Sequence, residues 1–402
     1  MIRHLYKPPP MTTAFARTLN SYIPRPYQFA GLVLVLVGSL LSMWLNEQIT
    51  VWTNGRMLGL SALTLAIIIG MVLGNTVYPK FAPKLADGVT FSKGQILRLA
   101  IMLYGFKLTL TQVASVGTSA IVIDAIVLSS TFMLTYFLGT RWLKVDRETA
   151  LLIGSGASIC GAAAVIAAEP VVKAEAHKVT IAVATVVVFG TLAMLLYPLL
   201  YHVGWLLPWL TPQQYGIYTG SSVHEVAQVV VAGNAINAEV GNTAVVTKMI
   251  RVMMLAPFLL ILSFVLTEKS PVKVTLTVSS ATTFAGTSTA ASNNTQTTFT
   301  KSGSKKSAFM ARLSQVKVPW FAFVFILIVV LHTFVSLSES FVATMVTLDN
   351  VLLTMAMFAL GLTTHLSAIK QAGVRPLLLG AIMFAWLILG GGLINVGINQ
   401  LL

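Results

Sequence analysis

Long apolar segments recur along almost the whole chain. A helix needs about 20 mostly apolar residues to cross the hydrocarbon core of a bilayer, and in lipid its backbone groups must bond within the segment. Segments of this kind lie at 27–45, 57–77, 96–116, 118–138, 150–168, 179–201, 217–235, 244–266, 318–337, 348–366 and 377–401. The pattern predicts an all-α, polytopic membrane protein with about 9 to 11 transmembrane helices.

The composition agrees with this class of protein and excludes several others. Of the 402 residues, 56% are hydrophobic and only 9% are charged, although the net charge is +14. Because charges are costly inside lipid, the basic residues indicate loops and topology rather than nucleic-acid binding. One cysteine, Cys160, excludes a disulfide framework, and no residue spacing suggests a metal site. We expect the lipid bilayer as a partner, with no nucleic acid and no cofactor.

The distribution of Lys and Arg sets the expected topology and organisation. Lys and Arg gather in 80–93, 141–147, 268–317 and 370–375, which predicts cytoplasmic loops and a cytoplasmic N-terminus. The chain is divided as follows: a basic cytoplasmic leader at 1–26, a first membrane region at 27–267, a disordered Ser/Thr-rich cytoplasmic linker at 268–317, and a second membrane region at 318–402.

Two segments, 150–168 and 217–235, are rich in Gly, Ala and Ser and are followed by polar turns. Eleven spans result if both cross the membrane and nine if both are re-entrant, and the sequence leaves this open. We expect interrupted helices near the midplane. Residues 99–117 and 355–373 share a weak pattern in opposite orientations, as in the inverted repeats of many transporters.

The stretch GSGASICGAAA at 154–164 is poor material for an uninterrupted helix. A helix that unwinds here would direct backbone N–H groups into a cavity, and so Gly156, Ser158 and Gly161 are candidates for an anion site. Close helix packing through small residues is the alternative. The stretch lacks the Lys-Ser/Thr of a phosphate-binding loop and the G-x-S-x-G of a hydrolase, and we expect no enzyme.

Polar residues interrupt the apolar stretch 220–228. His224 and Gln228 are four residues apart, which predicts a shared helix face, while Glu225 would point away as an ion coupler or a structural counter-ion. Ser222 precedes them.

Lys248 and Arg251 lie three residues apart on one face of the segment 244–266. Buried cations need partners, so we expect them to pair with Glu225 or Asp124, to attract an anionic substrate, or to do both. Lys107 could pair with Asp124, but we expect it to extend to the membrane interface.

Two motifs resemble a known family. LLIGSGASICGAAAVIAAEPVVKA at 151–174 and YTGSSVHEVAQVVVAG with VVTKMIRVMMLAP within 218–257 resemble the YeiH-type family of bacterial inner-membrane proteins, to which sulfate export is attributed. That family is similar to the cation/proton antiporter and bile-acid symporter fold group, which implies inverted repeats and crossed, discontinuous helices. The family-motif positions in this sequence are Gly156, Ser158, Gly161, Ser222, His224, Glu225, Lys248 and Arg251.

We therefore expect a secondary transporter of the inner membrane that exports sulfate or a related small sulfur-containing anion, coupled to H⁺ or Na⁺. The substrate-binding candidates are Gly156, Ser158, Gly161, Ser222, His224, Lys248 and Arg251, and the ion-coupling candidates are Glu225 and Asp124. The alternatives are a cation/proton antiporter, an uncoupled anion channel, and an intramembrane enzyme that uses Cys160 with His224. The sequence leaves open the substrate, the direction of transport, the coupling ion and whether the chain forms a homo-oligomer.

Overall fold

The computed structural model describes residues 22–53, 61–267, 319–335, 337–364 and 372–401. These residues form helices and no strand, as the sequence predicts. The α-helices are α2 (Phe29–Trp52), α3 (Ala62–Thr76), α4 (Tyr78–Phe91), α5 (Leu97–Leu103), α6 (Leu110–Phe137), α7 (Arg147–Ser158), α8 (Ala162–Val172), α9 (Ala176–His202), α10 (Pro212–Ser222), α11 (Val226–Ile236), α12 (Ala238–Met253), α13 (Leu255–Thr267), α15 (Trp320–Phe334), α16 (Glu339–Leu362) and α18 (Val374–Leu401). The predicted linker 268–317 and most of the leader lie outside the described residues.

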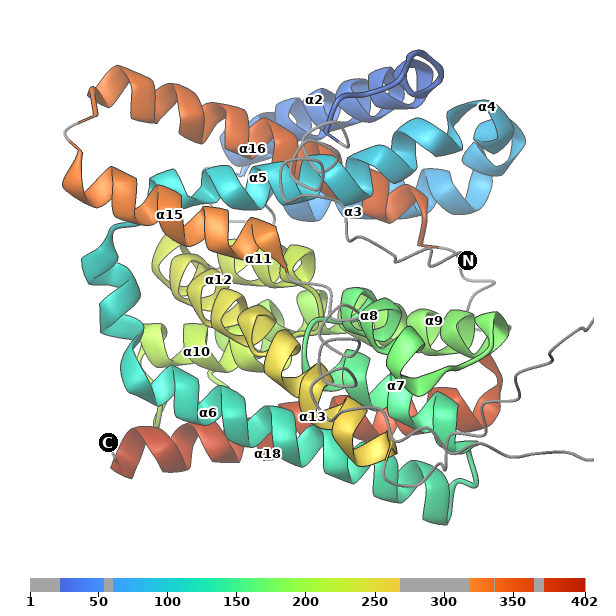
Figure 1. Ribbon diagram of the computed structural model, residues 1–402. Helices are drawn as coiled ribbons and strands as arrows, with labels where there is room; N and C mark the ends of the chain where they lie inside the picture. The colour runs from blue at the N-terminus through green and yellow to red at the C-terminus, as the bar shows by residue number, and fades with distance from the viewer. Residues whose placement is uncertain (1–21, 54–60, 268–318, 336, 365–371, 402) are drawn as a thin grey trace, which may run out of the picture.

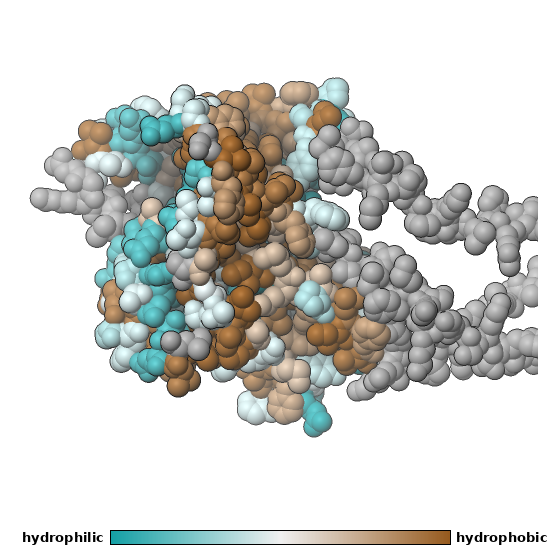
Figure 2. Space-filling model, turned by 60° about the vertical axis from the view of Figure 1, so that its left-hand side comes forward, coloured by the Kyte–Doolittle hydropathy of each residue, from teal (hydrophilic) through white to brown (hydrophobic). Residues whose placement is uncertain are grey.

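Long apolar helices dominate the structure. Six helices in the described part of the chain are long and apolar enough to cross a membrane: Pro26–Trp52, Val116–Trp142, Ala176–His202, Ala238–Leu266, Glu339–Leu362 and Val374–Leu401. Shorter apolar helices accompany them at Ala62–Thr76, Ala162–Val172, Val226–Ile236 and Trp320–Phe334. Figure 2 shows apolar side chains gathered in a broad band beside a hydrophilic margin, as a lipid-facing surface requires.

The helices lie in two layers (Figure 1). The upper layer holds α2 to α5 with α15 and α16, and the lower layer holds α6 to α13 with α18. Within them, α16 packs against α3 and α5, and α18 packs against α6, α9 and α10. Helices from both sides of the linker therefore contribute to each layer.

The predicted segment 96–116 is wrong as a single span. The backbone stays helical from α4 through a π-helical turn (Ser92–Ile96), α5 and a 3₁₀ turn (Tyr104–Lys107), and then becomes extended at Leu108 and Thr109. The hydroxyl of Thr109 caps the next helix by accepting a hydrogen bond from the N–H of Gln112 at 3.4 Å. Polar and apolar residues alternate across this break, and the average hydropathy of the long segment around it does not locate it. Lys80 and Lys84 consequently lie on a helix rather than in a loop.

The two Gly/Ala/Ser-rich segments form interrupted helices, as expected, and α6 also has a non-helical backbone at Gly117. The first break, Ile159 to Gly161, separates α7 from α8, and the second, Val223 to Glu225, separates α10 from α11. Gly161 has φ 67°, a conformation that glycine adopts without steric cost. The small residues 154–158 stay helical, so α7 ends only after them.

In each interrupted helix, the second half-helix ends on the side of the protein where the first half-helix begins. Lys178, at the start of α9, forms ion pairs with Glu148 at 2.9 Å and Asp146 at 3.5 Å, at the start of α7. Burial raises the pKa of Asp146, but the N–H of Thr149 and the Lys178 ammonium outweigh it and hold that pKa below its usual value. In the second pair, Gln213 near the start of α10 and Glu239 near the start of α12 line one cavity. Both pairs therefore form helical hairpins.

Close packing of α3 against α16 yields a first prediction. A Cβ on Gly70 would lie 2.5 Å from the carbonyl oxygen of Phe358 and 3.0 Å from Cα of Gly361. Gly70→Ala should therefore lower the free energy of unfolding by about 1–3 kcal/mol, because the backbones must separate. The measurement is the thermal unfolding of the purified protein in detergent.

Gly397→Ala is the matched control. It is also a helical glycine, but nothing lies within 4 Å of its would-be Cβ. This variant should unfold at or above the wild-type temperature. Equal melting temperatures for both variants would contradict the close contact.

Candidate transport site

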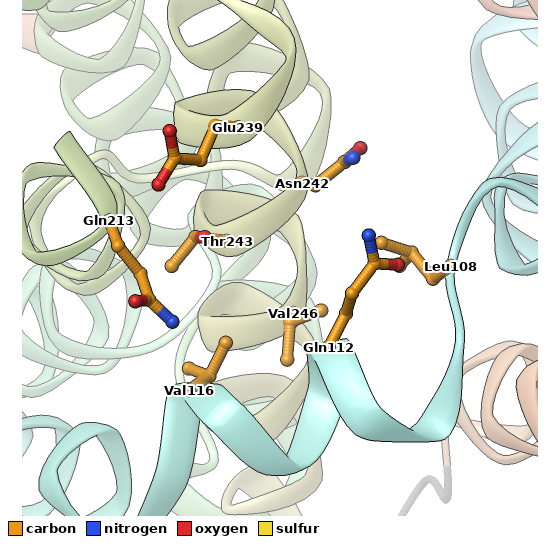
Figure 3. A pocket seen from close by; sticks show the side chains of 8 residues that line it. All are labelled: Leu108, Gln112, Val116, Gln213, Glu239, Asn242, Thr243 and Val246. Atoms are coloured by element: carbon orange, nitrogen blue, oxygen red, sulfur yellow. The ribbon is translucent and has the colours of Figure 1, made fainter.

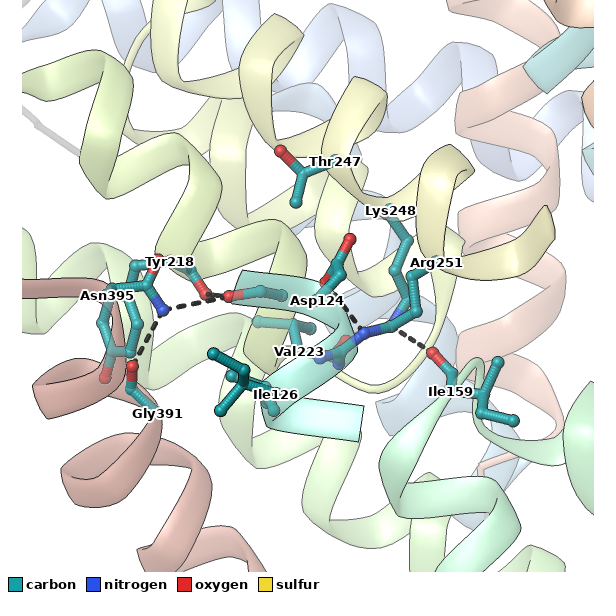
Figure 4. Close-up of polar contacts among 12 residues, drawn as sticks. Asp124, Ile126, Ile159, Tyr218, Val223, Thr247, Lys248, Arg251, Gly391 and Asn395 are labelled. Atoms are coloured by element: carbon teal, nitrogen blue, oxygen red, sulfur yellow. Dashed lines mark hydrogen bonds and ion pairs between the residues drawn. The ribbon is translucent and has the colours of Figure 1, made fainter. Parts of the chain in front are cut away.

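Lys248 joins the two helix breaks. Its ammonium donates hydrogen bonds to the carbonyl oxygen of Ile159 at 2.8 Å and to that of Val223 at 2.6 Å (Figure 4). These carbonyls belong to the residues that end α7 and α10, where unbonded backbone oxygens carry partial negative charge. The side chain is fully buried. One cation thus donates hydrogen bonds to carbonyl oxygens at the C-terminal ends of both half-helices, α7 and α10.

Glu225 lies at the opposite ends of the same breaks. Its Oε1 accepts a hydrogen bond from the N–H of Ala162, the first residue of α8, at 3.2 Å. Its own N–H donates to Oε1 of Gln228 at 3.1 Å at the start of α11. A Cβ on Gly161 would collide with the Glu225 side chain, so glycine is needed here. The carboxylate therefore neutralises the positive N-terminal end of α8.

The two helix breaks, Ile159 to Gly161 and Val223 to Glu225, meet at a place called here the crossing. Arg251 and Asp124 form a second charged pair beside this crossing. Nε of Arg251, on α12, lies 3.0 Å from Oδ1 of Asp124, on α6, and both side chains are completely buried (Figure 4). The terminal nitrogens Nη1 and Nη2, and Oδ2 of Asp124, have no hydrogen-bond partner among the described residues. Buried donors without partners are costly, and in native structures they usually bind water or a ligand.

Further buried polar atoms that have no hydrogen-bond partner in the described part of the chain come from the second break and its flanks. They are Oγ of Ser222, Nδ1 of His224 and Nε2 of Gln228. Ser222 faces α18, because a Cβ on Gly391 would lie 2.9 Å from its Oγ, and Gln228 packs on Gly190 of α9. The interior around the crossing is therefore polar as well as charged.

One cavity, the inner cavity, reaches the crossing between the two layers. It has a volume of about 460 Å³. Cys160, Ala162 and Glu225 line it at the crossing, while Lys93 and Arg98 line it on the upper layer. Most of its other lining residues are apolar, and Val252 and Leu255 belong to the second half of α12 and the start of α13.

A second cavity, the outer cavity, meets the first half of α12. It has a volume of about 400 Å³, and its lining includes Glu239, Asn242 and Thr243 of α12. Figure 3 shows these side chains facing Gln112 of α6 and Gln213 of α10. No described residue lines both cavities. Along α12, the outer cavity ends at Val246 and the inner cavity begins at Val252, roughly 9 Å apart at 1.5 Å per residue. Lys248 and Arg251 lie between them.

The structure places most of the predicted site residues around the crossing but gives them different contacts. The residues that meet there are Gly161, Glu225, Lys248, Arg251 and Asp124. The pairing of Arg251 with Asp124 is one of those predicted from the sequence. Lys248 binds carbonyls instead of Glu225. The predicted shared face of His224 and Gln228 is wrong, because α11 begins after His224.

Gly156 and Ser158 lie within α7. A Cβ on Gly156 would press on Val165 and Val186, at 2.7 and 2.8 Å, so this glycine permits close packing. Ser158 donates a hydrogen bond to the carbonyl oxygen of Ser155 at 3.4 Å. Substrate binding by these two residues stays a prediction.

One polar cluster near the outer cavity was not predicted from the sequence. Lys107 pairs with Asp349 at 2.8 Å and not with Asp124, and its extension to the membrane interface stays a prediction. Its ammonium also lies 4.5 Å from the ring centre of Tyr104, whose hydroxyl bonds Asn242 at 3.0 Å. Asp349 is an ionisable residue within an apolar segment, and this signal could have identified it.

Comparisons with known proteins identify the family of this chain. A family model described as "Conserved hypothetical protein 698" matches residues 30–285 and 289–380. The UPF0324 inner membrane protein YeiH of Salmonella typhi is 52% identical over 344 residues, which are 86% of this chain and 88% of that protein. YeiH of Escherichia coli strain K12 is 48% identical over 386 residues, 96% of this chain and 97% of that protein.

This chain belongs to the UPF0324 (YeiH) family. UPF0324 membrane protein PM1461 of Pasteurella multocida is 49% identical over 342 residues, 85% of this chain and 90% of that protein. No solved structure matches the chain. Like its relatives, this YeiH-family protein is a multi-pass protein of the bacterial inner membrane.

Replacing Lys248 tests how this YeiH-family protein maintains its crossing. Lys248→Met keeps an unbranched side chain but leaves the carbonyls of Ile159 and Val223 without their donor. The free energy of unfolding should fall by about 1–3 kcal/mol, because buried carbonyls lose their hydrogen bonds. Thermal unfolding in detergent measures the change.

Lys80→Met is the matched control, because Lys80 is exposed on α4. Its melting temperature should equal that of the wild type. A stable Lys248→Met protein would show that the two half-helix ends do not need this cation.

Proposed function

We propose that this YeiH-family protein is an ion-coupled secondary transporter that carries a small anion through the crossing of the two interrupted helices. The observation that carries the proposal is the pair of cavities that approach buried Lys248 and Arg251 from opposite ends of α12. A site reached alternately from two sides is the basis of secondary transport. The inner cavity lies between the two layers, so a relative movement of the layers would open or close it.

The topology of the proposed transporter follows from the two helical hairpins. With both hairpins re-entrant, neither counts as a span, which favours the lower end of the predicted range. Lys93 and Arg98 at the inner cavity mark the cytoplasmic side by the positive-inside rule, and the N-terminus is then cytoplasmic. The hairpins enter from opposite faces, which is the relation expected of inverted repeats.

The substrate we propose is sulfate or a related small sulfur-containing anion. Arg251 supports an anion, because its terminal nitrogens are buried and have no partner among the described residues. The N-terminus of α8 contributes less than the sequence suggested, since Glu225 already accepts the N–H of Ala162.

Glu225 favours a second candidate, a cation/proton antiporter. Its carboxylate lines the inner cavity at the crossing, where a cation entering from the cytoplasm would meet it. An uncoupled channel is less well supported, because no described residue lines both cavities.

The single cysteine allows a direct test of alternating access. Cys160 lines the inner cavity and is the only cysteine in the sequence, so labelling needs no background correction. A small anionic methanethiosulfonate should modify Cys160 from the cytoplasmic side, in inside-out vesicles. In a Cys160→Ala background, the cysteine introduced by Thr243→Cys should react from the other side, in right-side-out vesicles.

Transported anions should change the two labelling rates in opposite directions, because one cavity closes as the other opens. Mass spectrometry of the labelled protein gives both rates. Reaction of each cysteine from both sides would indicate a continuous pore. Rates that stay constant across a panel of anions, Na⁺ concentrations and pH values would refute transport at this crossing.

A further inference from the structure

Arg251 has more hydrogen-bonding capacity than Asp124 uses. Nε of Arg251 lies 3.0 Å from Oδ1 of Asp124 as an ion pair, and none of Nε, Nη1 and Nη2 has a hydrogen-bond partner among the described residues. Neither carboxylate oxygen of Asp124 has a hydrogen-bond partner among these residues. An arginine held tightly by a carboxylate usually forms two parallel hydrogen bonds. This pair is therefore incomplete, and the guanidinium can accept a different oxyanion.

The charges at the crossing balance when no ligand is bound. Lys248 and Arg251 are positive, Asp124 and Glu225 are negative, and all except Glu225 are fully buried. An added anion would leave an uncompensated negative charge in a poorly hydrated interior, which is strongly unfavourable. Anion binding therefore requires the arrival of a positive charge.

We propose that Asp124 and the transported anion compete for Arg251, so that the anion binds together with a proton taken up by Asp124. This inference rests on the proposed function and specifies its coupling. The proton comes from water in the open cavity and bonds to a carboxylate oxygen of Asp124, which becomes a neutral acid. The anion then takes the place of the carboxylate beside the guanidinium, and the total charge is unchanged for a monovalent anion.

Asp124 suits this role better than the other ionisable groups. The cations acting on it, Arg251 and Lys248, both come from α12. Glu225 already accepts a hydrogen bond from a helix N-terminus, an interaction that favours its charged form. His224 lies beside the same two cations, which would repel a third positive charge.

The remaining ionisable groups near the pair are two tyrosines and Cys160. Tyr197 of α9 acts on Arg251, and the ring centre of Tyr218 of α10 lies 4.9 Å from that of Tyr197. Figure 4 shows Tyr218 beside Asn395. Both tyrosines are neutral at physiological pH and keep their hydroxyls on backbone carbonyls, those of Leu387 and Ile388. The other helices packed against α6, which are α7, α15 and α18, place no charged side chain at the pair.

The geometry also indicates the class of anion. Two unpartnered terminal nitrogens on one planar guanidinium match two oxygens of a sulfonate, a carboxylate or a protonated sulfur oxyanion. One displaced carboxylate compensates one negative charge. The site therefore favours a monovalent oxyanion, and a dianion such as sulfate would need a second proton.

Calorimetry can measure the number of protons taken up with each bound anion. Methanesulfonate is a suitable probe, because it stays ionised throughout the accessible pH range and cannot take up the proton itself. Binding to the purified protein, titrated in buffers of different ionisation enthalpy, should take up about one proton per anion. The dissociation constant should rise by up to about tenfold per pH unit where Asp124 is ionised in the free protein.

Asp124→Asn should bind methanesulfonate without proton uptake and with a dissociation constant that does not change with pH. Asp349→Asn is the matched control, because it neutralises another buried, ion-paired aspartate away from the crossing, and it should keep the wild-type proton uptake. If Asp124→Asn fails to fold, the wild-type proton count decides alone.

Wild-type binding without proton uptake would overturn the proposal, as would unchanged uptake in a folded Asp124→Asn protein. Absence of any anion binding would overturn it too. The transporter proposal would survive each of these results if the two cysteine labelling rates still changed in opposite directions. Constant labelling rates together with proton-linked binding would instead refute transport alone.

Discussion

The structure depends on how the backbone N–H and carbonyl groups at four helix ends obtain hydrogen-bond partners inside a membrane protein. Each interrupted helix leaves a carboxyl-terminal end with unbonded carbonyls and an amino-terminal end with unbonded N–H groups, which lipid cannot solvate. Lys248 binds the carbonyls of Ile159 and Val223, and Glu225 binds the N–H of Ala162. One cation and one carboxylate thus hold together two hairpins that are far apart in the sequence.

This arrangement explains why charged residues persist in such an apolar chain. The half-helix ends make the interior polar, and a polar interior can accommodate the Arg251–Asp124 pair. The cavities on either side stop short of each other along α12, so the charges lie where access from one side is separated from access from the other. Transport is the proposed use of this geometry, and the incomplete Arg251–Asp124 contact supplies the proposed coupling.

Much of the fold could be predicted from the sequence, because lipid imposes simple rules. The helical class, the interrupted segments and the inner-membrane location follow from hydropathy, glycine content and the family motifs. The limits of the segment 96–116 were not predicted, because the average hydropathy of a long segment does not locate the extended backbone at Leu108, although Lys107 and Thr109 flank it. The residues of the crossing were identifiable, but their contacts were not. A lysine that satisfies two backbone carbonyls leaves no pattern in the sequence, and neither does the contact of Glu225 with Gly161.

The central claim is that a small anion crosses the membrane beside Arg251. Its most direct test is uptake of labelled sulfite, sulfate and methanesulfonate into proteoliposomes under a pH gradient, with wild-type protein and with an Arg251→Gln variant whose insertion is verified. The account predicts accumulation of at least one anion on the alkaline side with wild-type protein, and none with the variant. Equal accumulation with both proteins, or wild-type transport of Na⁺ without any anion, would contradict it.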